Sequence, residues 1–327
     1  MQYETLRFEL DDGIGVLTLN RPDRLNAINA VMLTELNSFW KEMLSMYECR
    51  VVVMTGSGDR GFCSGLDLKE AASMTGDVIN GETIQSGQKL FSDIIEMMRS
   101  CPQPIIAAVN GAAMGAGLSF AMAADVRLAS PAAKYCASYI NIGTGGADMG
   151  SSYFLWRIVG WGMAAEMLLT GRVIEIEEAH RIGLANHVYP REELMEKAME
   201  MARRMAEKSP LALRMTKDAI NIGLNSGNLR DTLRVEDRNQ VLLIESLYLA
   251  GGLLAAAALA VGGGRGGCCQ APGVLPARLP GRGGLPGRGT HAAVPGRTRT
   301  AGGAAAGAGG GEGDSRRRVR PAHGGAL

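Results

Sequence analysis

Histidine is scarce in this chain, and its scarcity limits the chemistry that the protein can perform. Only four histidines occur among 327 residues, and only His180 and His187 precede the Gly-rich end of the chain. A hydrolase triad needs a histidine beside a nucleophile and an acid, and catalytic zinc sites commonly use histidine ligands. Partners for either arrangement are not evident in the sequence. We therefore expect no metal site and no histidine-based nucleophilic catalysis.

Other familiar signatures are missing as well. The four cysteines before residue 249 are widely separated and form no Cys-x-x-Cys pair, which indicates a reducing compartment rather than disulfides or zinc. Neither the Gly-x-Gly-x-x-Gly motif nor the Gly-x-x-x-x-Gly-Lys-Ser/Thr motif is present, so a nucleotide cofactor lacks support. The first residues have no basic segment followed by an apolar one, as a signal peptide would. We expect a cytoplasmic protein.

Charge divides the chain near residue 249. From Leu249 onward there are 10 arginines, no lysine and two acids, giving a charge of +8, whereas residues 1–248 carry −7. Proteins that bind nucleic acid normally present a basic groove. The acidic charge of the body therefore argues against a nucleic-acid partner.

The segment 249–327 differs from the rest in composition. It holds 23 of the 45 glycines, interleaved with Ala, Pro and Arg, and cannot bury enough apolar surface to order itself. We predict a disordered tail or the product of out-of-frame translation of GC-rich codons. Two functional alternatives are an Arg-rich nucleic-acid contact and a membrane segment at residues 247–261. The latter is short for a span and contains Gly251-Gly252, so no membrane is expected.

The pattern of residues 1–248 predicts an α/β protein. Residues 3–19 alternate in polarity around Asp11-Asp12-Gly13, as in a β-hairpin. Continuous apolar runs predict buried strands, and apolar residues at helical spacing predict helices. The expected strands are 51–54, 105–109 and 125–129, and the expected helices are 29–46, 88–99 and 117–124. This order favours a layered α/β core, which we assign to residues 1–191.

A helical part follows the core. Residues 192–207, 210–224 and 228–244 have helical periodicity with no strand between them. We predict a separate C-terminal helical module over residues 192–248. Its apolar faces need a partner surface, which is compatible with oligomerisation.

Two segments rich in small residues are the best candidates for a functional site. They are Gly61-Phe62-Cys63-Ser64-Gly65-Leu66-Asp67-Leu68-Lys69 and Asn110-Gly111-Ala112-Ala113-Met114-Gly115-Ala116-Gly117. Each follows a predicted strand, and the second also begins a predicted helix. Small residues at such turns let backbone N–H groups approach a ligand, and two converging N–H groups can form an oxyanion hole. Gly-Ala-Gly also permits close helix packing, so each segment alone is weak support.

The same segments resemble motifs of the crotonase (enoyl-CoA hydratase/isomerase) superfamily. Asn20-Arg21-Pro22-Asp23-Arg24-Leu25-Asn26-Ala27 is similar to the family's opening motif, and both small-residue segments resemble its oxyanion segments. Leu168-Leu169-Thr170-Gly171-Arg172, with Gly183-Leu184 after it, resembles a later signature. The resemblance covers residues 4–244. It implies a ββα spiral core, a C-terminal helical oligomerisation module, a homotrimer or dimer of trimers, and a coenzyme A thioester as substrate without a further cofactor.

Residue roles follow from the resemblance. It implies that Leu66 and Ala116 supply the two oxyanion N–H groups, although Ala116 replaces the more usual Gly. The remaining residues that it assigns to substrate or coenzyme A binding are Arg24, Ser64, Gly65, Asp67, Leu68, Lys69, Gly115, Ser119 and Tyr139. Arg24 and Lys69 are cations suited to the phosphates of coenzyme A.

The resemblance breaks at the catalytic acids. Enoyl-CoA hydratases use two glutamates, and the corresponding positions here are Ser119 and Tyr139. Asp148 lies twelve residues before Gly160, the spacing of an active-site acid in relatives such as dienoyl-CoA isomerases and 4-chlorobenzoyl-CoA dehalogenases. We therefore expect a double-bond isomerase with Asp148 as proton shuttle. Alternatives are hydration by a non-standard base, nucleophilic attack by Asp148 as in a dehalogenase or hydrolase, and a non-catalytic binding or scaffold protein.

Overall fold

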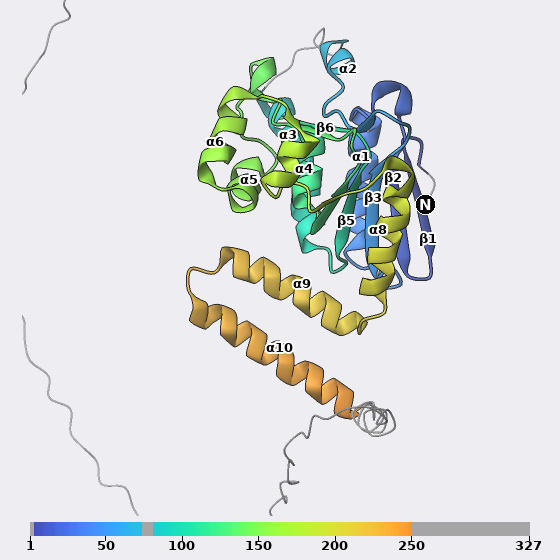
Figure 1. Ribbon diagram of the computed structural model, residues 1–327, viewed down its shortest axis with the longest axis vertical. Helices are drawn as coiled ribbons and strands as arrows, with labels where there is room; N and C mark the ends of the chain where they lie inside the picture. Colours follow the sequence, from blue (N-terminus) through green and yellow to red (C-terminus); the bar gives the residue numbers. More distant parts are fainter. Residues whose placement is uncertain (1–2, 74–80, 250–327) are drawn as a thin grey trace, which may run out of the picture. The chain divides into compact units, whose positions relative to one another are not determined.

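The computed structural model describes residues 3–73 and 81–249 (Figure 1). The predictions for the tail after Leu249 lie outside the described residues. Within the described ranges, the structure is a mixed α/β fold with two β-sheets and surrounding helices, so the expected fold class is confirmed. No helix in these ranges is long and apolar enough to cross a membrane.

The larger sheet has six strands in the order β1-β2-β3-β5-β7-β10. Its strands are β1 (Leu6–Asp11), β2 (Ile14–Leu19), β3 (Val51–Gly56), β5 (Ile105–Val109), β7 (Val126–Ala129) and β10 (His187–Val188). The predicted hairpin is β1 and β2, joined at Asp12 and Gly13, both of which have positive φ. From β2 onward the neighbouring strands are parallel. The continuous apolar runs predicted strands correctly here because helices cover both faces of these strands.

Alternate residues of the strands face opposite layers, as the two-residue period of a strand requires. On one face, Val51 and Val53 pack with Leu194 and Ala198 of α8 (Arg191–Ala206), the first helix of the expected C-terminal module. On the other face, Val52 and Met54 belong to the cluster that contains the buried residues of the core helices. These are α1 (Ala30–Met43), α3 (Gly81–Ser100) and α4 (Ala116–Ala123).

The smaller sheet was not predicted, and it carries the candidate site. Its strands, in spatial order, are β4 (Gly61–Cys63), β6 (Ala112–Met114), β8 (Lys134–Cys136) and β9 (Ile174–Glu175). β4 and β6 are parallel neighbours, so their carboxyl ends lie at the same edge of the sheet. Each of these two strands is part of one small-residue segment, so their pairing brings together segments that are about 50 positions apart in the sequence.

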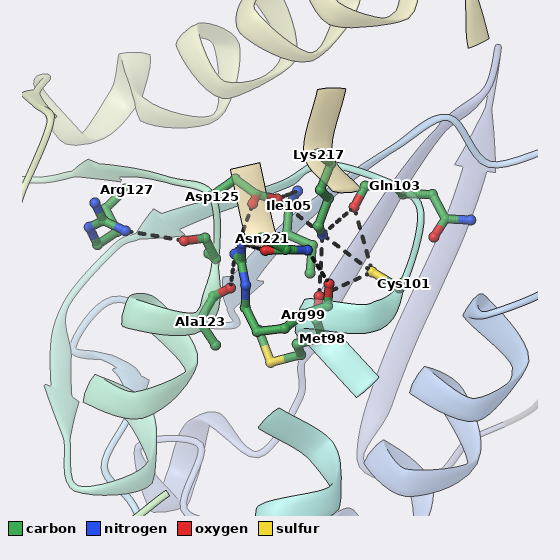
Figure 2. Close-up of polar contacts among 11 residues, drawn as sticks. Met98, Arg99, Cys101, Gln103, Ile105, Ala123, Asp125, Arg127, Lys217 and Asn221 are labelled. Atoms are coloured by element: carbon green, nitrogen blue, oxygen red, sulfur yellow. Dashed lines mark hydrogen bonds and ion pairs between the residues drawn. The ribbon is translucent and has the colours of Figure 1, made fainter. Parts of the chain in front are cut away.

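The remaining helices surround this edge or follow the core. They are α2 (Leu68–Ser73), α5 (Ser151–Val159), α6 (Trp161–Thr170), α7 (Ile176–Arg181), α9 (Pro210–Asn225) and α10 (Leu229–Leu249). A buried polar cluster attaches α9 to the end of α3 (Figure 2). In it, Lys217 Nζ lies 3.1 Å from Asp125 Oδ2 and donates to the carbonyl of Gln103 at 2.7 Å. Asn221 donates to the carbonyl of Arg99 at 2.9 Å.

Candidate active site

The two small-residue segments approach each other more closely than side chains would allow. A Cβ on Gly117 would lie 2.0 Å from the carbonyl oxygen of Cys63, so only glycine lets α4 pack against β4 here. Gly65 has a φ of +88°, and a Cβ on it would meet the Met114 carbonyl oxygen at 2.9 Å. Glycine is therefore required at both positions for the close approach of the two segments, and at Gly65 also for the positive φ.

The opening motif holds the first segment in place through the backbone. Ser64 N–H donates to the Leu25 carbonyl at 3.1 Å, Ile28 N–H to the Gly65 carbonyl at 2.8 Å, and Asp67 N–H to the Ile28 carbonyl at 2.9 Å. Because peptide groups alternate in direction along an extended segment, the N–H of Leu66 faces the other side. No described residue accepts a hydrogen bond from it.

Ala116 provides the second free donor. It is the first residue of α4, and the first N–H groups of a helix have no partner within the helix. No described residue accepts from its N–H either. Gly115, with φ +52°, makes the turn that precedes it. Both donors belong to the same pocket, the arrangement that an oxyanion hole requires.

That pocket has a volume of about 190 Å³. Eight predicted site residues line it: Ser64, Gly65, Leu66, Leu68, Gly115, Ala116, Tyr139 and Asp148. Gln88 and Phe91 of α3, Ile142, Thr144 and Met149 complete most of the wall and were not predicted. Gln88 and Phe91 are three residues apart on one helix face, but an ordinary amphipathic helix has the same pattern.

Asp148 is the one carboxylate among the described lining residues. Its Oδ1 accepts hydrogen bonds from Gln88 Nε2 at 2.5 Å and from the Met149 N–H at 2.7 Å. No described residue donates to Oδ2. The backbone of Asp148 is held by Ser151, whose Oγ accepts from the Asp148 N–H at 3.0 Å. The carboxylate is thus fixed through one oxygen, and the other remains able to exchange a proton.

Ser119 and Tyr139 form a buried, neutral pair beside this carboxylate. Their hydroxyl oxygens lie 2.6 Å apart. Burial raises the pKa of Tyr139 above its ordinary range, and the Ser119 hydrogen bond only partly opposes this. Burial likewise raises the pKa of the nearby Cys63 thiol to about 12. None of these three side chains is an anionic base near neutral pH.

The other predicted site residues do not line the pocket itself. Arg24 and Lys69 are exposed and do not line it. The Asp67 carboxylate contacts Arg21, with Oδ2 3.0 Å from Arg21 Nη1, and accepts from the Glu70 N–H at 3.3 Å. Among the described residues, no group of three or more His, Cys, Asp or Glu side chains is arranged to hold a metal.

Comparison with known proteins agrees with this geometry. The family profile described as enoyl-CoA hydratase/isomerase matches residues 9–255, past Ile244 where the motif resemblance ends. A protein named probable enoyl-CoA hydratase EchA12, from Mycobacterium bovis, is 38% identical over 232 residues, covering 70% of this chain and 81% of that protein. The short-chain-enoyl-CoA hydratase of Clostridium acetobutylicum is 36% identical over 225 residues, covering 68% and 84%.

Solved structures give the same result. The enoyl-CoA hydratase from Bacillus anthracis superposes with a TM-score of 0.72 at 31% identity, covering 78% of this chain and 96% of that one. A monofunctional enoyl-CoA isomerase from M. smegmatis gives 0.58 at 33% identity, covering 70% and 98%. The fold and the paired backbone donors thus define a crotonase-superfamily protein. Specifically, the chain belongs to the enoyl-CoA hydratase/isomerase family.

Proposed function

We propose that this enzyme moves a carbon–carbon double bond within an enoyl-CoA or dienoyl-CoA thioester, with Asp148 carrying the proton. One observation carries the proposal. Among the described residues that line the pocket, Asp148 is the carboxylate, and Leu66 and Ala116, which have free N–H groups, line the same pocket. Isomerisation needs one base that can return its proton, and it consumes no water. A single carboxylate is sufficient for that reaction.

The mechanism follows from the positions of these groups. The thioester carbonyl accepts hydrogen bonds from the Leu66 and Ala116 N–H groups. Asp148 Oδ2 removes a proton from the carbon adjacent to the double bond, and the electron pair moves into the conjugated system as an enolate. The negative charge on the thioester oxygen is stabilised by the two N–H groups, which are fixed in the folded backbone before the reaction. The same carboxyl group then returns the proton to the other end of the conjugated system.

Hydration is the second candidate, because relatives of this chain are named as hydratases. Adding water across the double bond requires a base for the water and an acid for the neighbouring carbon. Ser119 and Tyr139, whose hydroxyl oxygens lie 2.6 Å apart, are at the positions that the motif resemblance assigns to the two family glutamates. Asp148 would then have to perform both proton transfers. This arrangement favours isomerisation.

The remaining residues would bind the coenzyme A part of the substrate. Ser64, Gly65 and Leu68 line the pocket. The carbonyl of Arg24 accepts a hydrogen bond from Ser64 Oγ, and Lys69 follows Leu68 in the sequence. These two exposed cations would meet the phosphates. No further cofactor is required by this chemistry. We also propose a homotrimer or dimer of trimers, since α9 and α10 expose Ile220, Leu233 and Val241.

Mass spectrometry distinguishes the two reactions. The protein is incubated with 3-enoyl-CoA and 2-enoyl-CoA esters, and the product mass is compared with the substrate mass in H₂O and in D₂O. Isomerisation leaves the mass unchanged in H₂O and exchanges hydrogen for deuterium in D₂O, whereas hydration adds one water. A water adduct as the main product, lost in Asp148→Asn, would replace isomerisation by hydration. Conversion that persists unchanged in Asp148→Asn would contradict both versions.

A further inference from the structure

Two buried asparagines that are far apart in the sequence bind the same backbone carbonyl. Asn26 Nδ2 donates to the carbonyl of Gly61 at 2.8 Å, and Asn110 Nδ2 donates to it at 3.3 Å. Gly61 is the first residue of β4. We propose that these two asparagines are positioning residues of the oxyanion hole, holding the Leu66 segment and the Ala116 segment in register. The inference rests on the proposed function and names further residues on which its reaction depends.

Asn26 uses every hydrogen-bonding group of its side chain. An amide has two N–H donors and an oxygen that can accept twice. The second donor of Asn26 binds the Ser57 carbonyl at 3.0 Å. Its Oδ1 accepts from the Arg21 N–H at 2.9 Å and from Ser57 Oγ at 3.2 Å. The backbone of Asn26 has a φ of +56°, in the left-handed region that asparagine enters more readily than most residues. Asn26 therefore connects the opening motif to the β3–β4 loop and to the start of β4.

Asn110 makes matching contacts from the second small-residue segment. It directly follows β5 and is the first residue of that segment. Its Nδ2 also donates to the Gly58 carbonyl at 3.1 Å, and its Oδ1 accepts from the Gly56 N–H at 3.1 Å and from Thr55 Oγ1 at 3.4 Å. A buried amide with all its groups bonded has a single favourable orientation. Asn110 thus connects the second segment to the end of β3 and to the start of β4.

The strand pairing by itself leaves the register of the two segments weakly defined. β4 and β6 have three residues each, and the pairs that join them are Gly61 with Ala112 and Cys63 with Ala113. The register shifts between these pairs, because two steps along β4 correspond to one step along β6. Contacts outside such a short, irregular ladder must therefore help to determine its register. The two asparagines supply these contacts at Gly61, where the pairing begins.

This register determines how the two proposed oxyanion donors lie relative to each other. Leu66 follows Gly61 on the first segment, Ala116 follows Asn110 on the second, and both donors line the active-site pocket. A slip of one residue would move one donor by about 3.3 Å relative to the other. Oxyanion donors act at about 2.7–3.1 Å from the oxygen, so they do not tolerate such a slip. A displacement of about 1 Å can already lower the rate about 10²-fold.

Truncation of each asparagine tests the proposal. Asn26→Gly suits the positive φ, and Asn110→Ala suits its ordinary φ, so each removes the amide without adding backbone strain. Gln103→Ala is the matched control, because Gln103 is 2% exposed and does not line the pocket. Its Nε2 likewise donates to two carbonyls, those of Met43 and Met46. All three variants should have a lower Tm. The two asparagine variants alone should lose kcat, by about ten- to a hundredfold.

The carbonyl stretch of a bound thioester provides a readout that a loss of stability would not change. Butyryl-CoA labelled with ¹³C at the thioester carbonyl has no double bond to move, so infrared difference spectra of its complex with the full-length protein report hydrogen bonding alone. The wild type should lower the stretching frequency relative to the free ester, because fixed donors polarise the carbonyl. Asn26→Gly and Asn110→Ala should lose most of this shift, and Gln103→Ala should keep it. Should Asn110→Ala fail to fold, Asn110→Asp keeps the size and the acceptor and removes both donors.

The outcomes separate this inference from the proposed function. Loss of kcat and of the carbonyl shift in both asparagine variants, with both retained in Gln103→Ala, would support the positioning role. A lower Tm in all three variants, with kcat and the carbonyl shift unchanged, would overturn it and leave isomerisation standing. A carbonyl shift that the asparagine variants lose, in a protein that isomerises no enoyl-CoA, would support the positioning role and contradict the proposed reaction. A wild-type complex without any shift would contradict the oxyanion hole and this inference with it.

Discussion

Arg21 Nη1 donates a hydrogen bond to Asp67 Oδ2 at 3.0 Å, and this ion pair joins two motifs that are 46 residues apart. The side chains are 16% and 9% exposed. Arg21 also donates to the carbonyl of Ala27, and Asp67 directly follows Leu66. The pair therefore reinforces the backbone bonds that hold Leu66 at the edge of the pocket. Asp67, for which a coenzyme A contact is a prediction, contacts Arg21 in the structure.

Asp67→Asn should weaken both the fold and the reaction. It removes a hydrogen bond between charged groups, for which losses of about 1.5–3 kcal/mol are usual. Looser positioning of the Leu66 N–H should lower kcat more than it changes KM, because the enolate needs that donor most. Asp23→Asn, at an exposed acid of the opening motif that also contains Arg21, is the control. Denaturant unfolding measures the effect on stability, and steady-state kinetics measure the effect on the reaction. Equal kinetics in Asp67→Asn and Asp23→Asn would contradict a role of Asp67 in positioning the Leu66 N–H.

The pH dependence of stability gives an independent test of the same pair. Burial alone would raise the pKa of Asp67, but the Glu70 amide and the Arg21 guanidinium outweigh it and lower the pKa. A lowered carboxyl pKa stabilises the fold above the unfolded value of about 3.9, and the contribution is lost as the pH falls through the folded value. The difference in unfolding free energy between wild type and Asp67→Asn should be constant near neutral pH and shrink below about pH 4. A difference that grows on acidification would show that folding does not lower the pKa of Asp67.

Ala116→Pro tests the second oxyanion donor without altering a functional side chain. Proline is well tolerated at the first position of a helix, where its missing N–H costs no helical hydrogen bond. Loss of one such donor lowers kcat by about 10²–10³ in comparable sites. Ala116→Ser keeps the N–H and should retain most activity. Circular dichroism and thermal melting establish that both variants fold, and full activity in folded Ala116→Pro would exclude this N–H from the reaction.

The central strands β3 and β5 of the large sheet were predictable because they are buried throughout and almost entirely apolar. The run Ile105–Val109 is bounded by Pro104 and Asn110, and the strand has those bounds. The small sheet was missed because β4, β6 and β8 have three residues each, too few to show a period of two. Leu66 and Ala116 were found only because the motif resemblance assigned them. Their convergence depends on the pairing of β4 with β6, which is a long-range contact.

The partners of Asp148 were harder to predict than Asp148 itself. The predicted helix 88–99 begins at Gly81 in the structure, and Gln88 lies inside it rather than at its start. A glutamine on a helix surface gives no sign that it will bind a carboxylate 60 residues later. Met149 was not predicted either, because no sequence pattern indicates that it lines the pocket.

Lys217→Met should detach or loosen α9. Lys217 is 4% exposed, and its ammonium group is bound by Asp125 and two carbonyl groups at the end of α3. Methionine keeps the length of the side chain but leaves these acceptors without their donor, a change that commonly costs about 3–5 kcal/mol for a buried pair. Limited proteolysis after Arg214 and a lower Tm report the effect. Lys208→Met, at an exposed lysine, should behave like the wild type.

Asp148→Asn tests the mechanism most directly. An asparagine in the same position can still accept from Gln88 and the Met149 N–H through its oxygen, so the pocket should keep its shape. The substituted amide cannot take up a proton where Asp148 has Oδ2. Turnover should fall by about 10²–10⁴, the usual contribution of a general acid–base group. Affinity for a saturated acyl-CoA should hardly change, because the Leu66 and Ala116 N–H groups belong to the backbone.

Gln88→Leu separates the role of the carboxylate from that of its support. It removes the donor to Oδ1 while leaving Asp148 able to carry a proton, so turnover should fall less than in Asp148→Asn. Without that donor the carboxylate is held less firmly in the pocket, so kcat should fall while the affinity for a saturated acyl-CoA hardly changes. If Asp148→Asn lost no more activity than Gln88→Leu, the proton carrier would have to be a group other than Asp148.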